Sequence, residues 1–138
     1  MWILYGLLAG LTAALMTICA KIGLKNVDST LATTVRAVIM AGFMVGASLV
    51  TRKFALLHNL DGRSWRWVAL AGALGALSWL FYFLGLQQTS ASKLAALDRL
   101  SLPFIILFSV LLLNEKLSWP LAAGGVLVTI GAILIARA

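Results

Sequence analysis

Charged residues are scarce in this sequence of 138 residues: they make up 11% of the chain, whereas 62% of the residues are hydrophobic. An ordinary soluble domain is about 25% charged and about 45–50% apolar. Several charge-poor runs reach about 20 residues, the length that crosses a bilayer core of about 30 Å. The scarcity of charge therefore argues against a soluble domain and predicts an all-α integral membrane protein.

Cysteine, histidine and acidic residues are also rare. The single cysteine, Cys19, excludes an internal disulfide and a cysteine-based metal site. One histidine and four acidic residues form no cluster that would hold a metal, so we expect neither a metal nor another cofactor. The sequence has no nucleophile–base pair and no phosphate-binding loop, so we do not expect an enzyme.

Basic residues outnumber acidic ones, with 11 Lys and Arg in the chain. Most of them flank apolar runs, where such residues anchor a membrane protein beside anionic lipid. We therefore expect the lipid bilayer to be their partner and expect no binding to nucleic acid.

Five apolar runs are long enough to span a membrane, and breakers such as Asp61-Gly62 and Pro120 lie between them. The first run is too long for a signal-peptide core and no Lys or Arg precedes it, so we expect it to be retained. We predict one transmembrane domain over residues 1–138, with helices at about 1–20, 30–50, 67–86, 91–113 and 119–136.

Five spans place the two ends of the domain on opposite sides of the membrane. Five basic residues lie near the N-terminal side (Arg52, Lys53, Arg63, Arg66 and Lys116) and four near the other (Lys21, Lys25, Lys93 and Arg137). An excess of one gives almost no preferred orientation under the positive-inside rule. Two alternatives follow: the N-terminal side faces the cytoplasm, or the chain inserts both ways and forms an antiparallel homodimer.

The fourth run contains an adjacent Asp98-Arg99 pair, with Pro103 four residues beyond the arginine. A charge at the centre of a membrane helix costs about 2.5–3.5 kcal/mol on insertion scales. Neighbours on a helix point about 100° apart, so Asp98 shares a face with Ser101 whereas Arg99 shares one with Pro103. Because proline lacks an N–H, we expect it to free the Arg99 carbonyl and open the helix as a hinge.

Other polar or amphipathic residues lie at a similar depth on two further helices. At 1.5 Å per residue, Arg36 and Asp98 lie about 9 and 10 Å from the end of their runs. Trp79 and Tyr82 lie about 10 and 6 Å from the same side on the third run. We interpret them as one layer, about 5 Å from the midplane.

Two interpretations of this layer remain open. In the first, it is the substrate path: Arg36 pairs with Asp98, and the surplus arginine suits an anionic group on a substrate. Trp79 and Tyr82 then form an aromatic wall where a cation or ring could stack. In the second, the charges form a fixed bridge between helices and the aromatic residues serve packing. The path residues of the first hypothesis are Arg36, Trp79, Tyr82, Asp98, Arg99 and Ser101.

Small residues recur at a spacing of four along several runs. The motifs are Gly6-x-x-x-Gly10, Gly42-x-x-x-Gly46 and Ala71-x-x-x-Gly75, and the last run contains Gly124, Gly125 and Gly131. Such motifs let helices approach closely. We therefore expect a tight bundle, with the last helix as a candidate dimer contact.

The order of several features resembles the EamA-type domain of the drug/metabolite transporter superfamily. Between Trp79 and Ala136 the shared elements are Tyr82, Ser90-Ala91-Ser92, Pro103, Leu113-Asn114-Glu115, Gly125 and Gly131. The earlier stretch AKIGLKNVDSTLATTVRAVI resembles the segment that joins the first two helices of that domain. Asp98-Arg99-Leu100-Ser101 is similar to the charged element of the five-helix, single-domain members.

The resemblance implies a five-helix unit that pairs as an inverted homodimer, because larger relatives carry two such units in opposite orientation. It also implies a secondary transporter that moves a small metabolite or drug-like solute by alternating access, in the inner (cell) membrane of a prokaryote. The first helix lacks the acid of the four-helix multidrug pumps, so exchange of a cationic drug for protons is not expected. A lipid-carrier flippase subunit and a non-transporting membrane scaffold are the alternatives.

Overall fold

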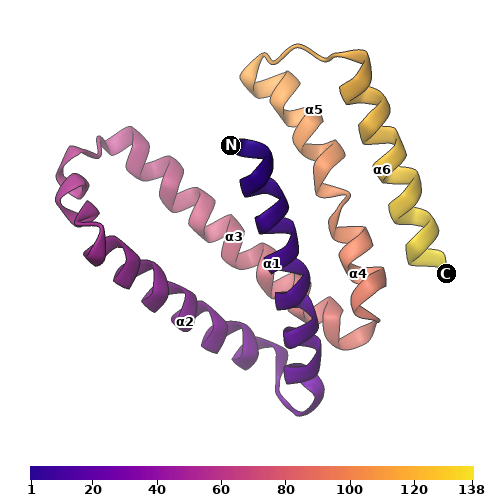
Figure 1. The fold of residues 1–138 in the computed structure, drawn as a ribbon, viewed down its shortest axis with the longest axis horizontal. Helices are drawn as coiled ribbons and strands as arrows, with labels where there is room; N and C mark the ends of the chain where they lie inside the picture. Colours follow the sequence, from indigo (N-terminus) through magenta and orange to yellow (C-terminus); the bar gives the residue numbers. More distant parts are fainter. The chain divides into compact units, whose positions relative to one another are not determined.

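The computed structural model describes residues 1–138 as helices joined by short connections, without strands (Figure 1). The α-helices are α1 (Trp2–Gly23), α2 (Ser29–Val50), α3 (Gly62–Gln88), α4 (Ala91–Asp98), α5 (Ser101–Leu113) and α6 (Trp119–Arg137). Two 3-10 helices, η1 (Leu24–Asn26) and η2 (Lys53–Asn59), lie in the connections. Five segments are long and apolar enough to cross a membrane, with α4 and α5 forming the fourth, which confirms the predicted all-α membrane fold.

The start of α3 and the continuity of the fourth span differ most from the sequence-based prediction. Helix α3 begins at Gly62 rather than at Trp67, because helix formation continues into polar residues that an apolar window leaves out. The fourth span is interrupted at Arg99 and Leu100, so it consists of two helices rather than one.

Short polar side chains define several helix starts. Each accepts a hydrogen bond from a backbone N–H that has no partner within the first turn. The acceptors are Asp28 for α2, Asp61 for α3, Ser90 for α4 and Ser118 for α6. At the other end of α5, Asn114 takes a left-handed conformation with φ of 54°, which stops the helix.

The helices group into two compact units. The first, residues 22–87, is an antiparallel hairpin of α2 and α3 joined through η2 (Figure 1). At its open end, Gln87 Nε2 donates a hydrogen bond to the Val27 carbonyl at 3.0 Å. This bond fixes the end of α3 beside the start of α2, so residues near these ends are held together.

The second unit contains residues 1–21 and 88–138. Helix α6 packs against both α4 and α5. Lys21 Nζ donates to the Thr89 carbonyl at 2.7 Å, which ties the end of α1 to the connection before α4. The two halves of the broken span therefore share α6 as a common support.

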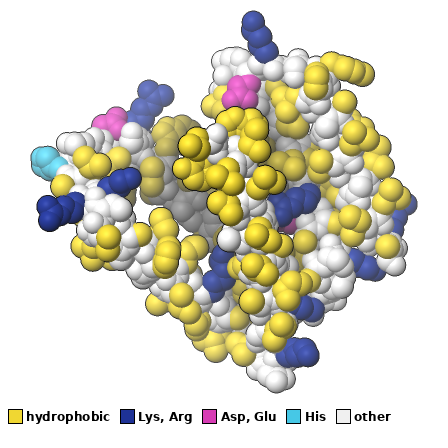
Figure 2. All heavy atoms as spheres, viewed as in Figure 1, with side chains coloured by type: hydrophobic (Ala, Val, Ile, Leu, Met, Phe, Trp, Pro, Cys, Tyr) yellow, Lys and Arg dark blue, Asp and Glu magenta, His cyan; other side chains and the backbone are white.

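Apolar side chains dominate the visible surface of the helices (Figure 2). No more than 11% of the most apolar window of any span is buried within the protein. In water such a surface would carry a large hydrophobic cost. These faces are therefore suited to contact lipid tails or another membrane protein.

The expectation of close packing at the glycine motifs is only partly met. A Cβ on Gly125 would lie 3.1 Å from Ile106 Cδ1, so this glycine admits the close approach of α5 to α6. A Cβ on Gly6, Gly10, Gly42, Gly46 or Gly75 would meet nothing within 4 Å. The residue spacing alone could not reveal this difference, because it does not specify which helix face meets a neighbour.

Candidate functional site

Arg36 of α2 lies against an aromatic cluster on α3. Its guanidinium carbon Cζ is 3.7 Å from the centroid of the Trp79 ring and 5.8 Å from that of Phe83. A cation within about 6 Å of a ring centroid is attracted to the ring face, by about 1 kcal/mol where the cation is still partly exposed, as Arg36 is. This attraction offsets part of the cost, about 2.5–3.5 kcal/mol, of a charge at membrane depth.

The ring under Arg36 is held in place by its own neighbours. Tyr82 and Phe83 follow Trp79 by three and four residues, which places the three rings on one side of α3. The Trp79 centroid lies 5.5 Å from that of Tyr82 and 6.2 Å from that of Phe83, with interplanar angles of 67° and 70°. These edge-to-face arrangements favour a single orientation of Trp79.

A cavity of about 720 Å³ lies between α2 and α3, beside Arg36 and Trp79. Its volume falls within the range of about 300–1,000 Å³ that is typical of small-molecule sites. Small residues of α3 such as Gly72 and Gly75 provide the space, so the motif around Gly75 lines a cavity rather than a helix contact. The remaining lining residues are Thr30, Thr33, Thr34, Ala37, Val38, Met40, Ala41, Ala76 and Leu80.

Arg36 is the only residue with a formal charge in the lining of this cavity. The Thr33 and Thr34 hydroxyls donate to carbonyls of their own helix, at 2.7 and 2.8 Å. Their protons are therefore occupied, and their oxygens can only accept further hydrogen bonds. The N–H groups of Arg36 are the strongest donors that the wall can offer to a bound molecule.

The predicted break in the fourth span is present, but its hydrogen bonding differs from the expectation. The Arg99 carbonyl accepts the Leu102 N–H at 3.1 Å, so Pro103 does not leave it free. Pro103 is the third residue of α5, a position where the N–H has no intrahelical partner in any case. The proline thus starts a new helix instead of opening a hole in a continuous one.

The charged pair lies at this break, where the regular helix ends. Asp98 is the last residue of α4 and Arg99 follows as its C-cap, with both side chains exposed within the single chain. The C-terminal end of a helix favours a cation and disfavours an anion. Ser101 opens α5, so the continuous helical face on which we placed it with Asp98 does not exist.

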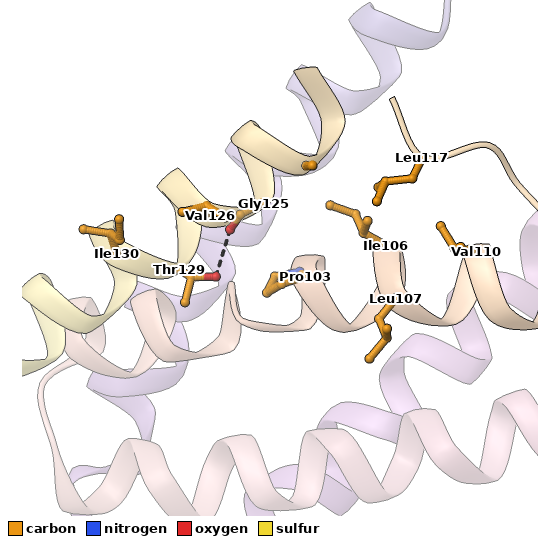
Figure 3. Close-up of a pocket in the computed structure, with 10 residues that line it drawn as sticks. Pro103, Ile106, Leu107, Val110, Leu117, Gly125, Val126, Thr129 and Ile130 are labelled. Atoms are coloured by element: carbon orange, nitrogen blue, oxygen red, sulfur yellow. Dashed lines mark hydrogen bonds between the residues drawn. The ribbon is translucent and has the colours of Figure 1, made fainter. Parts of the chain in front are cut away.

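A second cavity, of about 340 Å³, lies beside Pro103 between α5 and α6 (Figure 3). Ile106, Leu107 and Val110 line it from α5, and Val126 and Ile130 from α6. Its one hydroxyl, on Thr129, donates to the Gly125 carbonyl at 2.8 Å. The groove therefore offers apolar contacts and suits an apolar chain.

The structure brings some of the predicted path residues together. Arg36, Trp79 and Tyr82 form one cluster in the first unit. Asp98, Arg99, Ser101 and Pro103 gather at the helix break in the second unit. Sequence reasoning missed the contact of Phe83 with Arg36, although its spacing of four from Trp79 was a usable signal. It also missed the groove between α5 and α6, although Gly125, which lines that groove, indicated a close helix contact in the last span.

Five membrane-length helices define a multi-pass membrane protein, and one of its spans is broken beside a charged pair. The chain belongs to the EamA-like transporter family, whose model matches residues 1–137. It is similar to a Sinorhizobium sp. protein named "Uncharacterized transporter in cobO 3'region", with 33% identity over 135 residues, 98% of this chain and 96% of that protein. No solved structure matches the chain. The protein is a membrane transporter.

Proposed function

We propose that the chain is a secondary transporter that moves a small metabolite or drug-like solute by alternating access. The observation that carries this proposal is the cavity of about 720 Å³ between two membrane-spanning helices, with a single charge held in its wall. An ionisable residue at membrane depth marks a transport path more often than a structural contact. Arg36 and Trp79 would contact the solute, whereas Tyr82 does not line the cavity and would hold the Trp79 ring in its orientation.

The break between α4 and α5 supplies the moving part of this proposal. Transporter helices that are interrupted within the membrane can change the angle between their halves, which opens a site to one side and then to the other. Pro103 allows the break without loss of a hydrogen bond, and Asp98, Arg99 and Ser101 lie where the two halves meet. These residues would move when the angle between the two halves changes.

We further propose an antiparallel homodimer in the inner (cell) membrane of a prokaryote. The near balance of basic residues on the two sides supports insertion in both orientations. The open faces at Gly6, Gly10, Gly42 and Gly46 offer room for a second copy. A reporter fused after Ala138 tests the orientation, and activity in a single compartment would contradict dual insertion.

Flux into liposomes is the direct test of transport. Solutes that raise the thermal stability of the purified protein in a metabolite screen would be tested for uptake, with Arg36→Ala and Asp98→Asn beside the parent protein. We expect Arg36→Ala to lower uptake at least tenfold and Asp98→Asn to lower it by a smaller factor. Full uptake by both variants would reduce the charged residues to a structural role.

The groove beside Pro103 supports a second candidate, a lipid-carrier flippase or its subunit. The groove is apolar and lies within the membrane-spanning part of the chain, so an acyl or isoprenoid chain would suit it. Val126→Trp would fill the groove from an exposed position of α6, away from the tight contact of Ile106 with Gly125. Loss of scrambling of a fluorescent lipid, with solute uptake unchanged, would favour the flippase over the solute transporter.

A further inference from the structure

The wall of the cavity between α2 and α3 contains one positive charge, that of Arg36, and no acidic side chain. We infer that its ligand is a small organic anion, whose carboxylate is bound by Arg36 and whose flat apolar part lies along α3 beside Trp79. This inference rests on the proposed function and adds the chemical class of the solute.

The contact with Trp79 leaves the donors of Arg36 unsatisfied. The Cζ atom lies 3.7 Å from the ring centroid, and the interaction with the ring uses the positive charge but provides no oxygen as an acceptor. A guanidinium has five N–H donors in one plane, arranged in a fork that fits the two oxygens of a carboxylate. Such an anion would both hydrogen-bond the fork and neutralise the charge.

The other lining residues favour an anion over a cation. No Asp or Glu lines the cavity, so a cationic solute would meet the charge of Arg36 without a compensating carboxylate. Val38, Met40 and Leu80 give apolar surface for the rest of the molecule. Charge of one sign and an apolar wall together indicate an aromatic or similarly flat carboxylate.

Tryptophan fluorescence can test this inference because Trp79 lies at the proposed site. The other four tryptophans (Trp2, Trp65, Trp67 and Trp119) would be changed to phenylalanine, so that Trp79 is the only reporter. The probes are 3-nitrobenzoate, whose nitro-aromatic ring quenches tryptophan emission, and 3-nitrobenzamide, which has nearly the same shape without the charge. We expect saturable quenching by the benzoate, and at least tenfold weaker binding of the amide.

Substitutions of Arg36 distinguish the contribution of bidentate hydrogen bonding to ligand binding from that of the positive charge. Arg36→Lys keeps a positive charge but loses the bidentate geometry, and we expect it to raise the Kd for nitrobenzoate about tenfold. Arg36→Gln removes both and should abolish saturation. Arg137→Gln, at the end of α6 and outside the cavity, is the matched control and should leave the Kd unchanged. Thermal shifts of the full chain with the same probes repeat the comparison without the tryptophan replacements.

The outcomes distinguish the ligand class from the proposed transport. Equal Kd values for benzoate and benzamide, or a Kd unaffected by Arg36→Gln, would overturn the anion site. Uptake of a neutral or cationic solute that depends on Arg36 would also overturn the ligand class while supporting the path. Arg36-dependent binding of nitrobenzoate, with no solute crossing liposomes, would support the anion site and contradict transport.

Discussion

The α2–α3 hairpin and the α4–α5–α6 assembly accommodate polar groups at membrane depth in different ways. In the hairpin both helices are continuous, and Arg36 lies over Trp79 beside a cavity. In the assembly the helix is broken, and the charged pair lies at the break while the neighbouring groove is apolar. One region therefore combines a charge with space for a molecule, and the other combines charges with a change of helix direction.

We therefore expect the hairpin to bind the ligand and the break between α4 and α5 to permit the conformational change. A cation over a fixed aromatic ring is a rigid arrangement, suited to binding a ligand with defined chemistry. A helix break held by a proline offers a place where two rigid halves can change their angle. If the two regions have separate roles, a substitution in one should leave the corresponding property of the other unchanged, and a shared response would contradict this separation.

The largest effect on stability is expected from filling the contact between α5 and α6. A Cβ on Gly125 would already lie 3.1 Å from Ile106, so Gly125→Leu forces side chains apart, at a cost of about 1–3 kcal/mol. A Cβ on Gly42 of α2 would meet nothing within 4 Å, so Gly42→Leu should not lower the unfolding free energy of the single chain. Denaturant titration in detergent micelles measures both. Equal destabilisation would mean that α2 is packed as tightly as α6.

The next effect is on flux and concerns the broken span. Pro103→Leu permits a continuous helix from α4 into α5, and we expect uptake in liposomes to fall about tenfold, or about 1.4 kcal/mol in rate terms. Stability should be unchanged, because Pro103 lies in the first turn of α5, where its missing N–H removes no hydrogen bond. Pro120→Ala, in the first turn of α6, is the control that removes the other proline. Normal uptake by Pro103→Leu would show that the break is a fixed shape.

The sequence predicted the spans well because membrane length and apolar runs leave few alternatives. It also predicted the break, since Pro103 cannot continue a regular helix in the middle of a span. The start of α3 was missed because Arg63 and Arg66 are polar but still helical. Helix length follows backbone hydrogen bonding, whereas hydropathy reports only the part that lies in lipid.

The sequence predicted the depth of Arg36 and Trp79 in the membrane but not which side chains contact each other there. The rise of 1.5 Å per residue brought Arg36 and Trp79 to one level. Which side chain Arg36 meets depends on the rotation of α2 about its own axis, and one sequence does not set that angle. The stacking on Trp79, the contact with Phe83 and the cavity beside them are therefore properties that only the three-dimensional structure shows.

A smaller effect, about 1 kcal/mol, is expected from the cation–π contact of the hairpin. Arg36→Leu, Trp79→Leu and the double variant form a cycle that isolates the coupling of the two side chains. Trp119→Leu at the start of α6 is the control, because this tryptophan is 84% exposed. Unfolding free energies in micelles give the coupling. A value near zero would mean that Trp79 does not stabilise the arginine.

The smallest effect is a difference in acid sensitivity between the helix starts of the two regions. Asp61 caps α3, and hydrogen bonds from the side chain and then the backbone N–H of Ser64 lower the pKa of its carboxyl. Because the folded pKa is depressed, the stabilisation is present above the unfolded pKa of about 3.9 and is lost as the pH falls through the folded value. Ser118, which caps α6, has no such titration.

Hydrogen exchange of the amides just after each cap can measure this contrast. Corrected for intrinsic rates, residues 62–66 should exchange faster below about pH 4 relative to their rate at pH 6, whereas residues 119–123 should show no such change. Asp61→Asn keeps a good cap without a titrating group, so it should remove the pH dependence and preserve protection at pH 6. If residues 62–66 of Asp61→Asn still exchange faster at low pH, another group causes the loosening of α3. The cap at Asp61 would then not explain the contrast between the two helix starts.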